Sequence, residues 1–230
     1  MNLENTRTEP ELISFTTIRR AIGFLGMLLP AALVVISITV HSEKVWQESI
    51  SHYYYTLASG LFVGSLCAVG LFLITYKGFG PLDDFATNTA GVFAFCIALF
   101  PTTAPPEGSS WNIYSYAYSK PVSEIHLISA ALFFITLSLI SIFLFTKGKK
   151  DYQQNPQKRA RNRIYTTCGV LMLLFVILIG VYMMSDGLKE RYSEYNPTFW
   201  LECFALISFG VSWLVKGDTI CRDKTPELYK

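Results

Sequence analysis

Two histidines and a glutamate stand out because each lies near the start of a long apolar segment. His52 ends the stretch ESISH, His126 lies in SEIHLIS, and Glu202 lies about a turn and a half inside the segment that opens with PTFWLECF. An ionised side chain deep in a bilayer costs about 2.5–3.5 kcal/mol on insertion scales, so it should face the protein interior and find a partner. We therefore predict that these three side chains converge in one polar pocket.

Other polar side chains accompany the two histidines. Glu48 and Ser49 precede His52 by four and three residues, and Ser123 precedes His126 by three. On a helix, side chains at these spacings share a face. The predicted ligand-binding set is Glu48, Ser49, Ser51, His52, Ser123, His126 and Glu202.

Two imidazoles and a carboxylate are also the ligands of one class of catalytic zinc site, in which an open position holds an activated water. His52, His126 and Glu202 could hold zinc in this way, and Ser49 or Ser51 could polarise a substrate carbonyl. The chain has neither an HExxH nor an HxxxH motif. The same groups could instead form a proton relay, bind a polar head group, or pair with one another between helices, and the residues alone leave these alternatives open.

The composition indicates what must position these groups. Of the 230 residues, 51% are hydrophobic and only 16% are charged, and the mean hydropathy is +0.36, which is typical of an integral membrane protein. Apolar segments approach the roughly 20 residues that a helix needs to cross a bilayer, and lipid offers no partners to free backbone groups, so each segment should be helical. We predict an all-α bundle of six transmembrane helices near residues 20–40, 55–76, 85–102, 124–146, 163–184 and 197–215.

The distribution of Lys and Arg predicts the orientation of this bundle. Fifteen of them fall in the two tails and in alternate loops, and only four fall in the remaining loops. Because short basic loops stay in the cytoplasm, both termini should be cytoplasmic and the polar pocket should face outward. We expect a multi-pass protein of the plasma membrane, here a bacterial inner membrane. The predicted organisation is a tail at 1–19, a transmembrane domain at 20–216 and a second tail at 217–230.

The expected partners are the lipid bilayer and a lipid or small-molecule ligand. A net charge of only +2 argues against binding of nucleic acid. Gly60 and Gly64 lie four residues apart, a spacing that lets helix backbones approach closely, either within the chain or between copies in a homo-oligomer.

A second polar group lies at the predicted inner face. Asp84 and Asn88 lie four apart near the start of the third span, and Arg163 begins the fifth. We predict a structural cluster in which Asp84 pairs with Arg163 and Asn88 bridges helices.

The order of several short motifs resembles an uncharacterised family of prokaryotic six-helix membrane proteins, which is similar to the eukaryotic group containing the damage-regulated autophagy modulators. The motifs are SIS before the second span, FVGSL within it, LFPT at the end of the third and IHLISAALFF in the fourth, over about residues 20–150. The resemblance implies a compact bundle without assigned chemistry. It places Ser49 and Ser51 at the family's serine pair and His126 at its histidine.

The chain has a fainter similarity to the alkaline ceramidase and progestin–adiponectin receptor superfamily of membrane-embedded zinc hydrolases. His52 and either Asp83 or Asp84 match the first His and the Asp of that superfamily. The position four before His52 is Glu48 rather than Ser, and no paired His motif follows near the end. The resemblance implies lipid amide hydrolysis.

These observations support one leading hypothesis and two alternatives. The leading hypothesis is a membrane protein whose outward-facing polar pocket binds or transports a small or lipidic ligand. The alternatives are a membrane-embedded zinc-dependent lipid (amide) hydrolase and a structural or assembly protein without a small ligand, so the sequence leaves open whether the protein is an enzyme.

Overall fold

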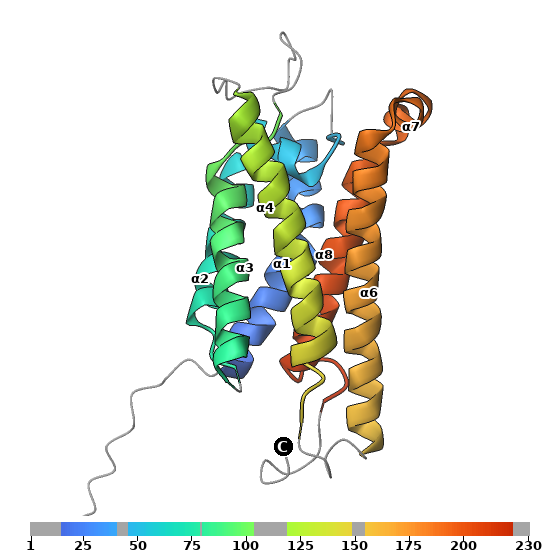
Figure 1. Ribbon diagram of the computed structural model, residues 1–230. Coiled ribbons are helices and arrows are strands. Elements are labelled where there is room, and N and C mark those ends of the chain that lie inside the picture. The colour runs from blue at the N-terminus through green and yellow to red at the C-terminus, as the bar shows by residue number, and fades with distance from the viewer. Residues whose placement is uncertain (1–14, 41–45, 79, 104–118, 149–154, 223–230) are drawn as a thin grey trace, which may run out of the picture.

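The computed structural model describes residues 15–40, 46–78, 80–103, 119–148 and 155–222. Every regular element in these ranges is helical (Figure 1). The long helices are α1 (Phe15–Val40), α2 (Ser59–Thr75), α3 (Pro81–Leu99), α4 (Lys120–Leu139), α6 (Pro156–Met184) and α8 (Pro197–Lys216). The short elements are the 3-10 helix η1 (Ile50–Tyr55), the π-helical end of α4, η2 (Ile140–Leu144), the helix α7 (Asp186–Tyr192) and the 3-10 helix η3 (Ser193–Tyr195).

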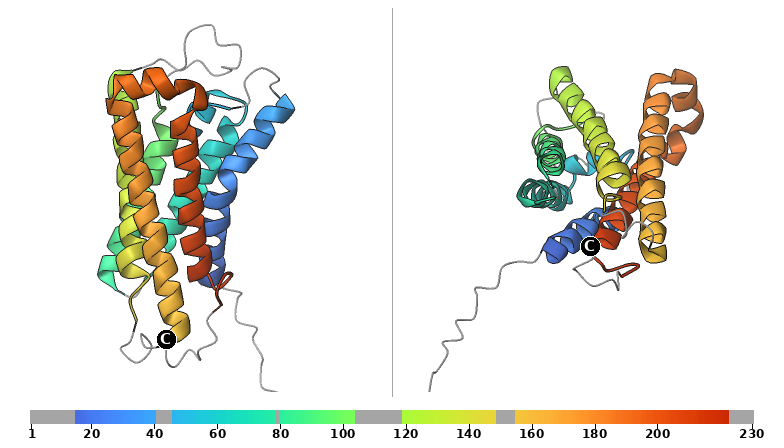
Figure 2. Two further views of the ribbon diagram at one scale, coloured as in Figure 1. Left: turned by 90° about the vertical axis from the view of Figure 1, so that its right-hand side faces the viewer. Right: turned by 60° about the horizontal axis from the view of Figure 1, so that its bottom comes forward.

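The six long helices pack as a closed ring. Each contacts its two neighbours in the order α1, α2, α3, α4, α6, α8 and back to α1 (Figure 2). Consecutive helices are therefore neighbours along most of the ring, and α8 closes it by fitting between α1 and α6. The largest fully buried side chain in the described ranges, Trp213, lies on α8 and is 1% exposed.

Five of these helices are long and apolar enough to cross a membrane, and the sixth, α2, is apolar but only 17 residues long. The all-α class and the multi-pass architecture predicted from the sequence are thus confirmed at this level. Four of the helices begin with proline in the first turn, where its missing N–H has no intrahelical partner to lose. These prolines are Pro81, Pro121, Pro156 and Pro197.

The predicted second span differs from the observed element. Residues 50–55 form the separate 3-10 helix η1, and α2 starts only at Ser59. The Thr56 hydroxyl donates to the Tyr53 carbonyl at 2.9 Å and accepts the Ala58 N–H at 3.1 Å. Such local side-chain bonds compete with helical ones, and they break the helix between η1 and α2.

Close helix approach occurs at glycines other than the predicted pair. A Cβ added at Gly60 or Gly64 would meet nothing within 4 Å, so a close helix contact within the chain does not require glycine at either position. Gly91 on α3 instead faces the backbone of Gly70 on α2, where a Cβ would lie 2.8 Å from the Gly70 carbonyl oxygen. The tight packing of this ring therefore depends on glycines deeper in the spans.

Candidate functional site

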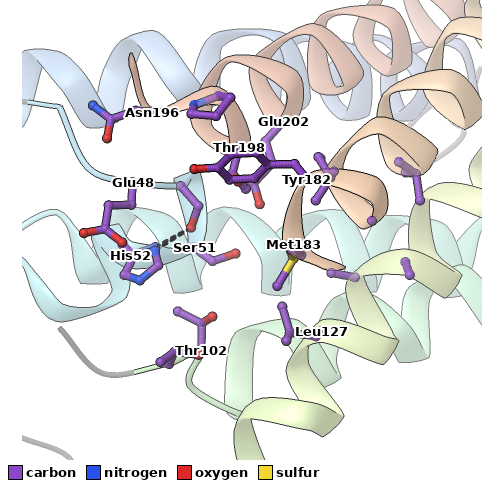
Figure 3. A pocket seen from close by; sticks show the side chains of 18 of the residues that line it. Glu48, Ser51, His52, Thr102, Leu127, Tyr182, Met183, Asn196, Thr198 and Glu202 are labelled. Carbon is purple, nitrogen blue, oxygen red and sulfur yellow. Dashed lines mark hydrogen bonds between the residues drawn. The ribbon is translucent and has the colours of Figure 1, made fainter. Parts of the chain in front are cut away.

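A cavity of about 890 Å³ lies between η1, α4, α6 and α8. Figure 3 shows Glu48, Ser51 and His52 at one end of it, with Leu127 and Met183 on another side. The cavity is lined by Glu48, Ser49, Ser51, His52, Thr102, Thr103, His126, Leu127, Ala130, Ala131, Phe134, Val176, Ile179, Gly180, Tyr182, Met183, Lys189, Ser193, Glu194, Asn196, Pro197, Thr198 and Glu202.

Six of the seven residues predicted to bind ligand line this cavity. They are Glu48, Ser49, Ser51, His52, His126 and Glu202. The seventh, Ser123, lies one turn before His126 and outside the lining, where its hydroxyl is 3.0 Å from that of Thr103. The segments that carry these six residues, at η1, α4 and α8, therefore meet at one end of the ring.

His126 is the most buried of these residues, at 0% exposure. Its Nδ1 lies 2.6 Å from the Phe100 carbonyl oxygen, and its Nε2 lies 2.9 Å from the Ser51 hydroxyl. Because a carbonyl oxygen can only accept, Nδ1 carries a proton and donates to Phe100. In the neutral imidazole Nε2 is then the acceptor, and the Ser51 hydroxyl donates to it.

Glu202 ties η1 to α8. Its carboxylate accepts the backbone N–H of Ile50, with Oε2 and N 2.5 Å apart. The Phe199 N–H of α8 donates in turn to the Glu48 carbonyl at 3.1 Å. These two bonds dock the start of η1 on the start of α8, and Ser51 and His52 of η1 line the cavity.

His52 is held by its own 3-10 helix. Its Nδ1 lies 2.7 Å from the Ser49 hydroxyl, which also accepts the His52 backbone N–H at 3.3 Å. Ser49 is therefore the N-cap of η1. The predicted pairing of residues three apart is present, although the element is a 3-10 helix rather than the start of the second span.

The zinc interpretation does not match this arrangement. Within the described ranges, no group of three or more His, Cys, Asp and Glu side chains could hold one metal ion. His52, His126 and Glu202 are all described, and they bind to Ser49, to Phe100 and Ser51, and to Ile50 respectively. They share a cavity but not the close spacing that a metal requires.

The sequence analysis did not predict most of the residues that line the cavity. Its walls come from apolar and small residues of α4 and α6, such as Ala130, Phe134, Val176 and Gly180. Residues of these types occur throughout any membrane span, so no pattern marks them out. Thr102 ends the LFPT motif and Thr103 follows it, so both could have been suspected from their place after the third span.

The structure does not bring the predicted inner cluster of Asp84, Asn88 and Arg163 together. Asp84 binds Lys77 at 3.3 Å and the Gly78 N–H at 2.9 Å rather than Arg163, while Asn88 and Arg163 are exposed. The buried acid is the neighbouring Asp83. The ion pairs that join separate helices here are Asp83–Lys147 and Arg161–Asp218, each with its N and O atoms 2.5 Å apart.

The comparisons with known proteins identify a family. Residues 24–207 match the family described as "Protein of unknown function (DUF998)". The chain belongs to this family. The match agrees with the predicted membership of an uncharacterised membrane family and extends beyond residue 150. It gives no support to a relation with the autophagy modulators or with the ceramidase superfamily. No curated protein and no solved structure matches the chain.

Proposed function

We propose that this DUF998 protein binds an amphiphile, either a lipid or a small molecule with an apolar chain, in the cavity between η1, α4, α6 and α8. The observation that carries the proposal is the division of the cavity lining into two parts. One end carries hydroxyl, imidazole and carboxyl groups, including those of Ser51, His126 and Glu202, and the walls carry aliphatic and aromatic side chains. Ligand sites combine an apolar lining with a few convergent polar groups in this way, and 890 Å³ lies in their usual size range.

The packing of α4 against α6 supports entry of a chain from the side. The two helices are joined near one end, where the Ser138 hydroxyl donates to the Gly169 carbonyl and the Ser141 hydroxyl to the Tyr165 carbonyl. From there the helices diverge toward the end that carries α7 (Figure 1). The cavity walls lie in this diverging part, which would face the acyl chains of a bilayer. An apolar tail could therefore lie between α4 and α6 while its head group meets the polar end.

The charge distribution favours an outward orientation of the cavity. Lys and Arg are concentrated on the side of the two tails, and that side is cytoplasmic by the positive-inside rule. The cavity lies at the opposite end of the ring, beside α7 and the start of α8. The proposed ligand is therefore an amphiphile of the outer leaflet.

The proposal is tested by filling the cavity without disturbing the packing. Gly180 lines the cavity, and a Cβ added there would meet nothing within 4 Å, so Gly180→Leu should add side-chain volume at the cavity wall without strain at its Cβ. We expect this variant to weaken binding of the fluorescent fatty acid dansyl-undecanoic acid at least tenfold, measured by titration of the purified protein in nanodiscs.

Gly64→Leu is the matched control. Gly64 also has open space around its Cβ but lies on α2, away from the cavity, so this variant should bind the probe like the wild type. Equal binding by the wild type and Gly180→Leu, or no saturable binding by the wild type, would contradict the proposal.

A further inference from the structure

We propose that Ser51 and His126 form a nucleophile–base pair that cleaves an acyl ester bound in the cavity. This inference rests on the proposed binding of an amphiphile and adds a reaction to it. The substrate class is an ester of an aliphatic acid, because the apolar walls would hold an acyl chain and would present its carbonyl carbon to the polar end, where Ser51 lies.

The hydrogen bonds around His126 are those that an activated serine needs. The Ser51 oxygen lies 2.9 Å from Nε2, within the range for proton transfer between a nucleophile and its base. The Phe100 carbonyl, 2.6 Å from Nδ1, fixes the tautomer that leaves Nε2 unprotonated. In serine hydrolases a third group orients the histidine in the same sense, and here a backbone carbonyl occupies that position.

His126 is more buried than Ser51, as expected for a fixed base beside an accessible nucleophile. His126 is 0% exposed, so the surrounding packing and its two hydrogen bonds fix its ring. Ser51 is half-buried and lines the cavity, so a bound acyl group could reach its hydroxyl. The other serine–histidine pair, Ser49 and His52, differs from Ser51 and His126. The Ser49 hydroxyl caps η1, and Ser49 is only 5% exposed. Of the two serines predicted from the sequence, Ser51 is therefore the nucleophile.

Two further contacts hold Ser51 in place from either end of η1. Glu202 accepts the Ile50 N–H, immediately before Ser51. The Tyr55 hydroxyl donates to the Thr102 carbonyl at 2.6 Å and holds the far end of η1 against the segment that follows α3. Phe100 lies in that same segment, so one segment orients both the serine and the histidine. Glu202 and Tyr55 are positioning residues.

The reaction proceeds in two balanced steps. The Ser51 oxygen bonds to the ester carbonyl carbon while its proton passes to His126 Nε2. The ester C–O bond then breaks, and the leaving alcohol takes that proton, which leaves an acyl group on Ser51. A water molecule attacks the acyl-serine with His126 again as the base, and this releases the acid and restores the Ser51 hydroxyl.

The test uses a covalent probe on the full-length protein in nanodiscs. A dodecyl fluorophosphonate should react with the Ser51 oxygen with loss of fluoride, and peptide mapping by mass spectrometry should find the adduct on Ser51 of the wild type. Ser51→Ala should lose this adduct. His126→Gln keeps an amide that can hydrogen-bond but cannot act as a base at neutral pH, so it should slow labelling at least tenfold.

Ser129→Ala is the control variant. Ser129 is buried on α4, one turn beyond His126, and lies outside the cavity lining, so its removal should leave the labelling rate unchanged. A melting temperature recorded for each variant separates loss of the nucleophile from loss of the fold. The labelled residue is mapped on the wild type itself, so that result does not depend on whether any variant folds.

The outcomes separate this inference from the proposed function. An adduct on Ser49 or on another residue, or no adduct on a wild type that binds dansyl-undecanoic acid, overturns the nucleophile–base pair and leaves amphiphile binding intact. Saturable binding that is insensitive to Gly180→Leu overturns the proposed cavity site, whatever residue is labelled.

Discussion

The two ends of the helix ring use their polar residues in opposite ways. At the end beside α7, mostly uncharged side chains surround a cavity of about 890 Å³, together with Glu48, Lys189, Glu194 and Glu202. At the other end, charged side chains are packed around a space of only about 10 Å³, which is lined by Tyr76, Asp83, Thr87, Ile140, Leu144, Phe145 and Lys216. The first arrangement leaves room for a ligand, and the second leaves room for about one water molecule.

We call the end beside α7 the outer end and the opposite end the inner end, after the orientation proposed above. The contacts at the inner end join almost every helix of the ring. Arg20 of α1 donates to the carbonyl of Gly217, which follows α8, at 2.8 Å. Lys158 of α6 donates to the Phe145 carbonyl at 3.1 Å, and the Lys216 ammonium lies 5.1 Å from the centre of the Phe145 ring. Charged residues buried here therefore fix the helices relative to one another.

The difference between the two ends explains how the ring can be held firmly at its inner end and still enclose a cavity at its outer end. Because the inner end is cross-linked, α4 and α6 can part at the outer end without unfolding of the bundle. A ligand cavity needs such a separation, and it would be unstable if both ends were loosely held. The comparison predicts that inner substitutions mainly affect stability and that outer substitutions mainly affect binding.

The largest expected effect is that of Asp83→Ala. Asp83 is 3% exposed, pairs with Lys147 and lines the same small space as the buried Lys216. Its removal breaks an ion pair whose acid is buried but whose Lys147 side chain is 42% exposed, so the loss should lie at the lower end of the about 3–5 kcal/mol typical of a broken buried pair. We expect a loss of this size in the free energy of unfolding, measured by titration with sodium dodecyl sulfate in mixed micelles.

Asp84→Ala is the control for this prediction. Asp84 pairs with Lys77, whose side chain is 63% exposed, and exposed pairs contribute less than about 1 kcal/mol. Similar losses in the two variants would mean that the inner end is not held by its buried acid.

The second prediction compares Arg161→Met with Arg163→Met. The buried Arg161 guanidinium binds the Asp218 carboxylate at 2.5 Å and donates to the Val215 carbonyl at 2.9 Å, whereas Arg163 is exposed. Hydrogen bonds to charged groups contribute about 1.5–3 kcal/mol, so Arg161→Met should lower the free energy of unfolding by about 2–3 kcal/mol. Arg163→Met should change it by less than about 0.5 kcal/mol, as is usual at the surface. A larger loss in the free energy of unfolding for Arg163→Met than for Arg161→Met would support the sequence-based choice of Arg163.

Six of the seven residues chosen from the sequence line one cavity, whereas the residues of the predicted inner cluster do not meet, and the reason is physical. His52, His126 and Glu202 are rare polar residues at the starts of three spans that begin on the same side, so topology alone brings them to one depth. Which side chains meet in the inner cluster depends on how each helix is rotated about its own axis. The helix α3 starts at Pro81 rather than near residue 85, and its rotation buries Asp83 instead of Asp84.

The same reasoning explains the remaining differences. The helix α6 starts at Pro156 rather than near residue 163, so part of the basic loop is helical and Arg161 turns inward. Hydropathy places a span by its apolar residues and cannot detect a charged turn that is buried by neighbouring helices. The apolar walls of the cavity depend on how far α4 and α6 diverge, and this is a property of packing rather than of either segment.

The smallest expected effect comes from removing one hydroxyl at each end. Ser141→Ala deletes the donor to the Tyr165 carbonyl at 2.8 Å, where Ser141 is 0% exposed, and an unsatisfied buried group costs about 1–3 kcal/mol. Ser51→Ala deletes the donor to His126 Nε2, but this atom borders a cavity in which water can replace the hydroxyl. We therefore expect Ser51→Ala to lower the free energy of unfolding by less than about 1 kcal/mol, and less than Ser141→Ala does. The two variants make the same chemical change on the same type of residue, so a larger loss for Ser51→Ala would mean that the hydrogen bond between η1 and α4 is a structural tie comparable to those at the inner end.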